Sequence, residues 1–187
     1  MTGTATAPDE AWLPGDPPPS ARVAAMLRVD QAGEFGAARI YAGQLAVLGR
    51  SAAGPVLRRM AAQEAEHLKM FDALIAERRV RPTALRPFWS LAGYALGAAT
   101  ALLGERAAMA CTVAVEETID AHYRAQLAEL GDAEPALSTT IETFRQEELE
   151  HRDIGVAHGA EQTPGYRLLH AAIAAGCRIA IRLSERL

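Results

Sequence analysis

The residues best suited to chemistry are two copies of the pattern Glu-x-Glu-His, in the segments "AAQEAEHLKM" (61–70) and "RQEELEHRDI" (145–154). In a helix, residues i and i+3 lie on one face, about 60° apart. This geometry places Glu64 beside His67, while Glu66 points elsewhere. Buried carboxylates without a counter-charge cost several kcal/mol each. A bound cation would make such a cluster tolerable, so the two segments predict a metal site.

A second repeated pattern, E-x6-Y-x2-Q-L, supplies two further carboxylates. Glu34 is followed by Tyr41 in the first copy, and Glu116 by Tyr123 in the second. Each half of the chain therefore offers one Glu, and then a Glu-x-x-His on the next helix. By the same repeat, Glu116 and not Glu117 is in phase with Glu34.

The repeat also decides between two neighbouring acids on the last of these helices. Both Glu147 and Glu148 could reach the face of His151. The equivalent of Glu147 in the first half is Gln63, a poor anionic ligand, so the repeat favours Glu148. The predicted metal ligands are Glu34, Glu64, His67, Glu116, Glu148 and His151.

Two Glu and two Glu-x-x-His motifs on four helices are typical of di-iron and di-manganese carboxylate bundles. Two divalent ions carry +4, which balances the −4 of the four glutamates. Oxygen-rich ligation with one imidazole per metal suits iron or manganese better than copper, and it lacks the thiolates of structural zinc. A single Glu-x-x-His could be explained by the alternative, a surface pattern of solvated acids. The duplicated frame favours the metal site.

The elements that must position these residues are helices. Periodicity and breaker residues predict helices at 20–49, 55–79, 105–130 and 137–158, with a last segment at 166–187. Ser20 is the expected cap of the first helix, and Pro55 suits the first turn of the second. A connection of some 25 residues joins the second and third helices. The fold class expected is all-α, a ferritin-like four-helix bundle with a long apolar crossover segment and a C-terminal amphipathic helix.

Composition and charge limit the other possibilities. The chain has 187 residues, 50% of them hydrophobic, which suits one domain with a substantial core. We expect residues 1–19 to be a disordered lead-in and residues 20–187 to form the domain. A net charge of −4 predicts no nucleic-acid partner. Cys111 and Cys177 are expected to be reduced and buried.

Three stretches resemble a known family. "RVDQAGEFGAARIYAGQ" (28–44), "ACTVAVEETIDAHY" (110–123) and "EELEHRDIG" (147–155) are similar to the demethoxyubiquinone hydroxylases of ubiquinone biosynthesis, as is the ending "GCRIAIRLSERL". The resemblance covers residues 20–187. It implies a monooxygenase that uses O₂ and two Fe ions per chain, and the family's six iron ligands fall on the six residues above.

The resemblance also implies a substrate and a location. The substrate would be a polyprenylated demethoxyquinol, hydroxylated on its ring, and the enzyme would be a peripheral membrane protein on the cytoplasmic face of a bacterial inner membrane. A protein partner from ubiquinone biosynthesis fits this interpretation. No GxGxxG motif indicates a bound nucleotide, so the quinol itself or an external reductant would supply electrons.

Two segments have compositions that fit contact with lipid. Residues 87–104 carry no charge, but as a helix they would span only about 27 Å, slightly short of a bilayer core. We expect a crossover helix that meets the membrane or the lipid tail; a membrane span and complete burial are the alternatives. The tail has Arg178, Arg182 and Arg186 beside Ile173, Ile179, Ile181 and Leu183, which suits either anionic lipid or a solvated face.

Several polar residues have less specific roles. Tyr41 and Tyr123 lie two turns beyond their glutamates and would line the substrate approach, relay protons, or simply be core tyrosines. Asp30 would hold a ligand imidazole or pair with an arginine. The remaining histidines, His122, His158 and His170, match no ligand phase and are assigned structural roles.

Two rival functions remain. A ferroxidase, iron store or manganese catalase would share the ligand pattern, but would need neither the apolar crossover nor the basic tail. A non-enzymatic lipid-binding bundle would not need six phased ligands. Metal analysis separates the second rival from the expected hydroxylase, and quinone profiling separates the first.

Overall fold

Six α-helices and one short 3₁₀ helix make up residues 19–187, which are the residues that this computed structural model describes. The helices are α1 (Pro19–Leu48), α2 (Gly54–Glu77), α3 (Arg86–Leu102), α4 (Glu105–Leu130), α5 (Pro135–Ala157) and α6 (Tyr166–Arg186), with η1 (Ala160–Gln162) before α6. The described residues contain no strand. The predicted all-α fold class is confirmed.

The helix boundaries lie close to those expected from the sequence. Pro55 stands in the first turn of α2, as predicted. α1 begins at Pro19, so Ser20 lies within its first turn and is not the residue before it. The predicted disordered lead-in otherwise falls on residues 1–18, outside the described part of the chain.

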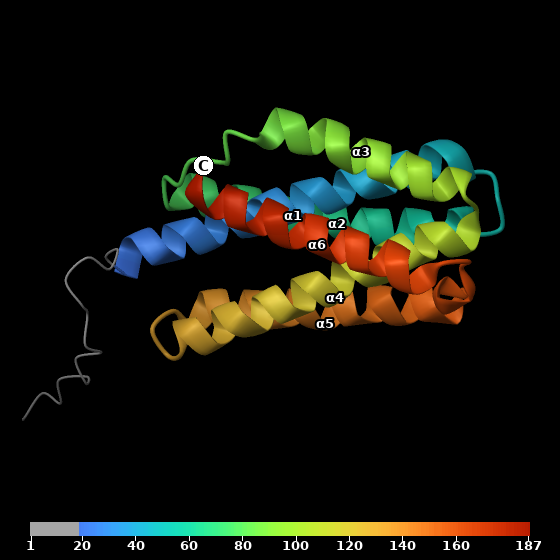
Figure 1. The fold of residues 1–187 in the computed structure, drawn as a ribbon. Coiled ribbons are helices and arrows are strands. Elements are labelled where there is room, and N and C mark those ends of the chain that lie inside the picture. The colour runs from blue at the N-terminus through green and yellow to red at the C-terminus, as the bar shows by residue number, and fades with distance from the viewer. Residues whose placement is uncertain (1–18) are drawn as a thin grey trace, which may run out of the picture.

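Four long helices form the bundle. α1 packs along α2, and α4 packs along α5, so each half of the sequence repeat is one helix pair (Figure 1). α6 lies against both α1 and α4 and covers the bundle from one side. Fully buried side chains such as Leu57, Phe71 and Ile141 fill the core, beside buried carboxylates and imidazoles.

The crossover helix α3 packs closely along α1 because glycines face the contact. A Cβ added to Gly97 would lie 1.9 Å from the Ile40 carbonyl oxygen, and one added to Gly43 would lie 2.2 Å from that of Tyr94. Any larger residue would push the two backbones apart. α3 is therefore fixed to the bundle along one face, while Leu91 and Leu102 on it are exposed. Complete burial of this segment, one expected alternative, is wrong.

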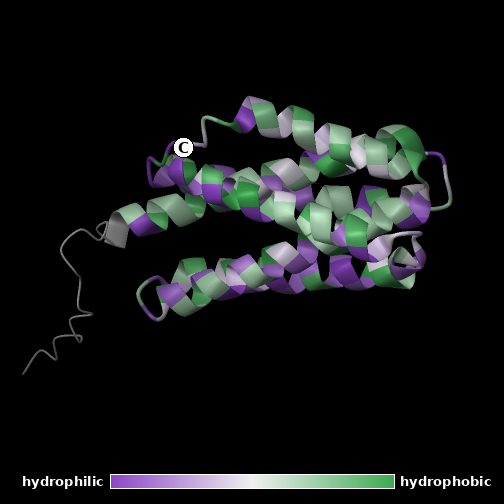
Figure 2. Cartoon of the chain, viewed as in Figure 1, coloured by the Kyte–Doolittle hydropathy of each residue, from purple (hydrophilic) through white to green (hydrophobic). Residues whose placement is uncertain are grey.

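Among residues 19–187, no helix combines the length and the apolar composition that a membrane crossing requires. The alternative that residues 87–104 cross a bilayer is therefore not supported. α3 is nevertheless almost free of strongly hydrophilic residues after its first turn, whereas such residues recur along α5 (Figure 2).

Candidate metal centre

The six predicted ligands come from four helices and meet in the core. α1 and α4 each supply one glutamate, and α2 and α5 each supply a Glu-x-x-His. All six are at most 1% exposed. Their donor atoms form two groups, each within 4.8 Å: Glu34, Glu64, His67 and Glu148, and Glu64, Glu116, Glu148 and His151.

The two groups share Glu64 and Glu148, so the cluster has the form of two adjacent cation positions. Glu34 with His67 belongs to one position, and Glu116 with His151 to the other. Both histidines direct Nδ1 inward: His67 Nδ1 lies 3.0 Å from Glu148 Oε1, and His151 Nδ1 lies 3.1 Å from Glu148 Oε2.

Several carboxylate oxygens in the cluster have no hydrogen-bond partner although they are buried. They include Glu34 Oε2, Glu116 Oε2 and both oxygens of Glu64. Glu64 Oε1 does lie 3.0 Å from His151 Nδ1, but without the geometry of a hydrogen bond. Unpaired buried acceptors of this kind are costly. The donor set therefore fits metal ions, which would satisfy these oxygens.

The electrostatics point in the same direction. Burial, together with repulsion from neighbouring carboxylates, raises the pKa of Glu64 and Glu116 well above the usual value. Burial also opposes ionisation of Glu148, but hydrogen bonds with His151 and His67 overcome it and lower the pKa to about 2. Without cations, only some of the four carboxylates can be ionised. Two divalent ions would allow all four carboxylates to ionise.

The two tyrosines of the repeat cross-link the halves. The Tyr41 hydroxyl donates to Glu116 Oε1 at 3.2 Å, and the Tyr123 hydroxyl donates to Glu34 Oε1. Burial raises the pKa of both phenols well above the usual value, so they remain protonated donors. The structure thus places both tyrosines against the glutamates of the opposite half.

The structure corrects the expectation for Asp30. It accepts a hydrogen bond from Gln126 Nε2 at 2.8 Å and lies 3.3 Å from His122 Nε2, so it contacts neither a ligand imidazole nor an arginine. Histidines outside the cluster have structural surroundings: His170 pairs with Glu117 at 2.8 Å, and His158 is exposed at the end of α5. Glu66 is exposed and pairs with Lys69.

Sequence reasoning missed the two residues that lie behind the histidines. Glu147 Oε2 is 2.5 Å from His67 Nε2, and Gln63 Oε1 is 3.1 Å from His151 Nε2. The equivalence of Glu147 and Gln63 in the repeat argues against Glu147 as a metal ligand, but it does not reveal the contact with His67. The repeat could still have identified both residues, because Gln63 and Glu147 occupy the same position, directly before a ligand glutamate.

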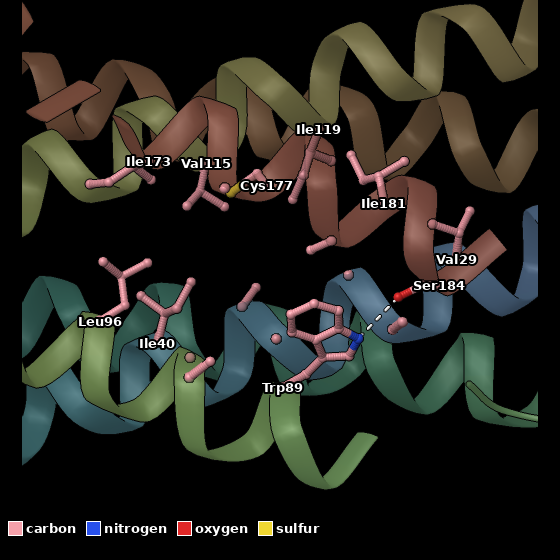
Figure 3. Close-up of a pocket in the computed structure, with 18 of the residues that line it drawn as sticks. Val29, Ile40, Trp89, Leu96, Val115, Ile119, Ile173, Cys177, Ile181 and Ser184 are labelled. Atoms are coloured by element: carbon pink, nitrogen blue, oxygen red, sulfur yellow. Dashed lines mark hydrogen bonds between the residues drawn. The ribbon is translucent and has the colours of Figure 1, made fainter. Parts of the chain in front are cut away.

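The helices α1, α3, α4 and α6 enclose a cavity of about 470 Å³ (Figure 3). Its walls are almost wholly apolar, with Val29, Leu96, Ile119, Ile173 and Ile181 among them. A hydrogen bond of 3.0 Å from Trp89 Nε1 to Ser184 Oγ joins α3 to α6 at its wall (Figure 3).

The cavity approaches the carboxylate cluster through a shared wall. Ala37, Ile40 and Val115 line the cavity, and they also line a small adjoining pocket bounded by Tyr41 and Glu116. The tail residues Ile173 and Ile181 thus face inward, whereas Ile179 is 57% exposed. Of the four apolar tail residues, only Ile179 and Leu183 are therefore exposed beside the arginines.

Both cysteines are free thiols, as expected. Cys111 is buried and Cys177 is half-buried at the cavity wall. Burial raises the pKa of Cys111 to about 12 and that of Cys177 to about 11, so neither is an activated nucleophile.

Comparison with known proteins gives relatives over nearly the whole chain. A 3-demethoxyubiquinol 3-hydroxylase of Rhodospirillum rubrum is 61% identical over 186 residues, which cover 99% of this chain and 87% of the relative. The mitochondrial NADPH-dependent 3-demethoxyubiquinone 3-hydroxylase of Homo sapiens is 56% identical, covering 89% of this chain and 79% of the relative. The mitochondrial 5-demethoxyubiquinone hydroxylase of Saccharomyces cerevisiae is 41% identical, covering 87% and 77%.

The family model described as "Ubiquinone biosynthesis protein COQ7" matches residues 21–184, which include the carboxylate cluster, the cavity lining and nearly all of the six helices. With this match and relatives of such high identity, the resemblance read from the sequence is confirmed. The chain belongs to the COQ7 family of ubiquinone biosynthesis proteins.

Proposed function

We propose that this protein is an O₂-dependent monooxygenase that hydroxylates the ring of a polyprenylated demethoxyubiquinol. The observation that carries the proposal is the buried cluster of four glutamates and two histidines beside an apolar cavity. The names of the relatives, which are 3-demethoxyubiquinol or demethoxyubiquinone hydroxylases, support the substrate.

Two Fe ions per chain are the proposed cofactor. Glu34 and His67 would hold one ion and Glu116 and His151 the other, with Glu64 and Glu148 as the pair common to both. The four carboxylates carry −4 when ionised, which two Fe²⁺ ions neutralise. Bound iron supplies the activation of O₂, a redox reaction that these side chains do not perform by themselves.

The chain's own residues hold protons and exclude water around this centre. Tyr41 and Tyr123 stay protonated and donate hydrogen bonds to Glu116 and Glu34, and so fix the orientation of these two carboxylates. Both tyrosines are at most 2% exposed. They can line the path by which the substrate approaches, or relay a proton, without opening the site to solvent.

The apolar cavity is the proposed binding site for the quinol. Its walls offer contacts for an isoprenoid tail and almost no polar groups, as a lipid-soluble substrate requires. The quinol ring would bind at the end of the cavity where Ile40 and Val115 separate it from Tyr41 and Glu116. These side chains would have to move for the ring to reach the iron ligands.

The outer faces of α3 and α6 are the proposed contact with membrane lipid. Leu91 is 71% exposed, Leu102 75% and Leu168 78%. The exposed Arg178 and Arg182 stand beside Ile179 on α6 and suit anionic headgroups. Both helices also line the cavity, so docking here would bring the cavity close to the lipid surface. We place the protein peripherally on the cytoplasmic face of a bacterial inner membrane.

The electrons for each turnover would come from outside the chain. The quinol or an external reductant would supply them, in keeping with the NADPH dependence named for the human relative. A second protein of ubiquinone biosynthesis is a proposed partner in delivery of the substrate.

A deletion strain tests this function. Cells without the protein should accumulate a quinone that lacks one ring oxygen, the hydroxyl that is later methylated. With ¹⁸O₂, the purified enzyme should place the label in the new hydroxyl. Normal quinone in a deletion strain without a second hydroxylase would return the ferroxidase hypothesis to first place. Label from H₂¹⁸O, under conditions without solvent exchange, would rule out insertion of oxygen from O₂.

A further inference from the structure

The two histidines of the cluster are held from behind by different groups. Each directs Nδ1 toward Glu148, and each presents Nε2 to a residue of the opposite half. For His67 the residue is Glu147, with Oε2 at 2.5 Å; for His151 it is Gln63, with Oε1 at 3.1 Å. When Nδ1 binds a metal, the ring proton is on Nε2, so each Nε2 donates a hydrogen bond to the oxygen behind it.

The arrangement is symmetric in geometry but asymmetric in charge. Gln63 and Glu147 occupy the same position of the repeat, directly before a ligand glutamate, and each reaches across between α2 and α5. A carboxylate acceptor makes a hydrogen bond roughly twice as strong as a neutral one. It also raises the basicity of the imidazole as a metal ligand. The histidine in front of Glu147 is therefore the stronger ligand.

We infer that Glu147 and Gln63 are positioning residues that make the two metal positions unequal. The position of Glu34 and His67 binds a divalent ion more tightly than the position of Glu116 and His151. Neither residue is a ligand, because each contacts the side of the ring that points away from the cluster. The inference rests on the proposed metal centre and adds an order of filling to it.

Titration of the metal-free, full-length protein with Co²⁺ tests this order. The wild-type protein should bind two ions in two resolved steps. Glu147→Gln should weaken the tighter step by about 10- to 100-fold and bring the two affinities together. Gln63→Glu should tighten the weaker step. Glu150→Gln removes the same charge from the exposed side of α5 and should change neither step.

The hyperfine-shifted NMR signals of the two Nε2 protons give a readout that general damage to the fold would not produce. The Co²⁺-loaded wild-type protein should show two distinct signals, and in Glu147→Gln one of them should move toward the other. The double variant Glu147→Gln/Gln63→Glu transfers the carboxylate to the opposite histidine. It should restore both the separation of the signals and the two unequal affinities.

Each contrary result has a separate meaning. Equal affinities and unmoved signals in Glu147→Gln would overturn the inequality and leave the metal centre standing. Loss of one Co²⁺ equivalent in that variant, with one signal absent and the other unmoved, would make Glu147 a ligand and overturn its positioning role. A wild-type protein that binds no Co²⁺ would overturn the metal centre and this inference together.

Discussion

Glu64 and Glu148 differ from the other two glutamates of the cluster because their oxygens belong to both groups of ligand atoms. Glu34 and Glu116 each belong to one group. Loss of a shared carboxylate therefore affects both cation positions, whereas loss of an unshared one affects a single position.

This difference predicts the metal content of variants. Glu148→Ala should lose both ions, and Glu34→Ala should retain more metal than Glu148→Ala. Metal analysis of the purified proteins, with wild type at about two irons per chain, checks the ranking. Glu150→Ala, on the exposed side of the same helix, is the control and should keep wild-type content. Full occupancy in Glu148→Ala would remove Glu148 from the ligand set.

Tyr123 tests the role of the phenols. Tyr123→Phe removes the donor to Glu34 Oε1 but leaves the ring packing. If the hydroxyl only positions its neighbours, iron should remain bound and the fold should lose about 1 kcal/mol. Turnover should then fall by less than about a hundredfold, below the range typical of a general acid or base. A larger fall with iron retained would show that the phenol transfers a proton in the reaction.

At the scale of elements, α6 has two faces with separate roles. One face lines the cavity through Ile173, Cys177 and Ile181, and the other exposes Arg178 and Arg182. Deletion of residues 166–187 would therefore remove a cavity wall together with the basic face. Single charge changes separate the two roles.

Arg182→Glu should weaken binding to vesicles that contain anionic lipid. An arginine near such a surface contributes about 1 kcal/mol, so its reversal should cost at least roughly fivefold in affinity. Vesicle sedimentation at low and high salt measures the change. Arg59→Glu, on the exposed face of α2, makes the same charge change away from α3 and α6 and should have little effect. Equal binding by both variants would place the lipid contact elsewhere, with α3 the next candidate.

At the scale of the whole molecule, the buried cluster makes folding depend on metal and pH together. Burial raises the pKa of Glu64 and Glu116 well above the unfolded value of 4.5. The metal-free folded state therefore holds protons that the unfolded state releases, and its stability falls as pH rises above about 4.5. His67 acts in the same direction above its usual value of 6.5, because its hydrogen bond with Glu148 and the nearby charge of Glu34 outweigh burial and raise its pKa to about 12.

Metal-free protein should accordingly unfold at lower temperature at pH 8 than at pH 5. Metal-loaded protein should not follow this trend, because bound cations stabilise the ionised carboxylates at both pH values. Thermal unfolding with and without a chelator measures the difference. Parallel pH curves for the two forms would mean that the carboxylates are not buried as a cluster in the folded protein.

The sequence by itself determined features that lie within one helix or that recur in the two halves of the chain. Helix boundaries follow from apolar periodicity and from breakers such as Pro55, and the pairing of Glu64 with His67 follows from the fixed angle between residues i and i+3. The duplication then related Glu34 to Glu116 without any knowledge of packing. These features depend on one helix at a time, so sequence reasoning could reach them.

Only the tertiary structure decided the contacts that cross between helices. The hydrogen bond between Glu147 and His67 joins residues 80 positions apart, and the contact between Asp30 and His122 joins residues 92 apart. The cavity likewise requires α1, α3, α4 and α6 to leave apolar space between them. Such contacts depend on the distance and rotation of packed helices, here set partly by the close approach at Gly97, and a helix's own periodicity does not contain that information.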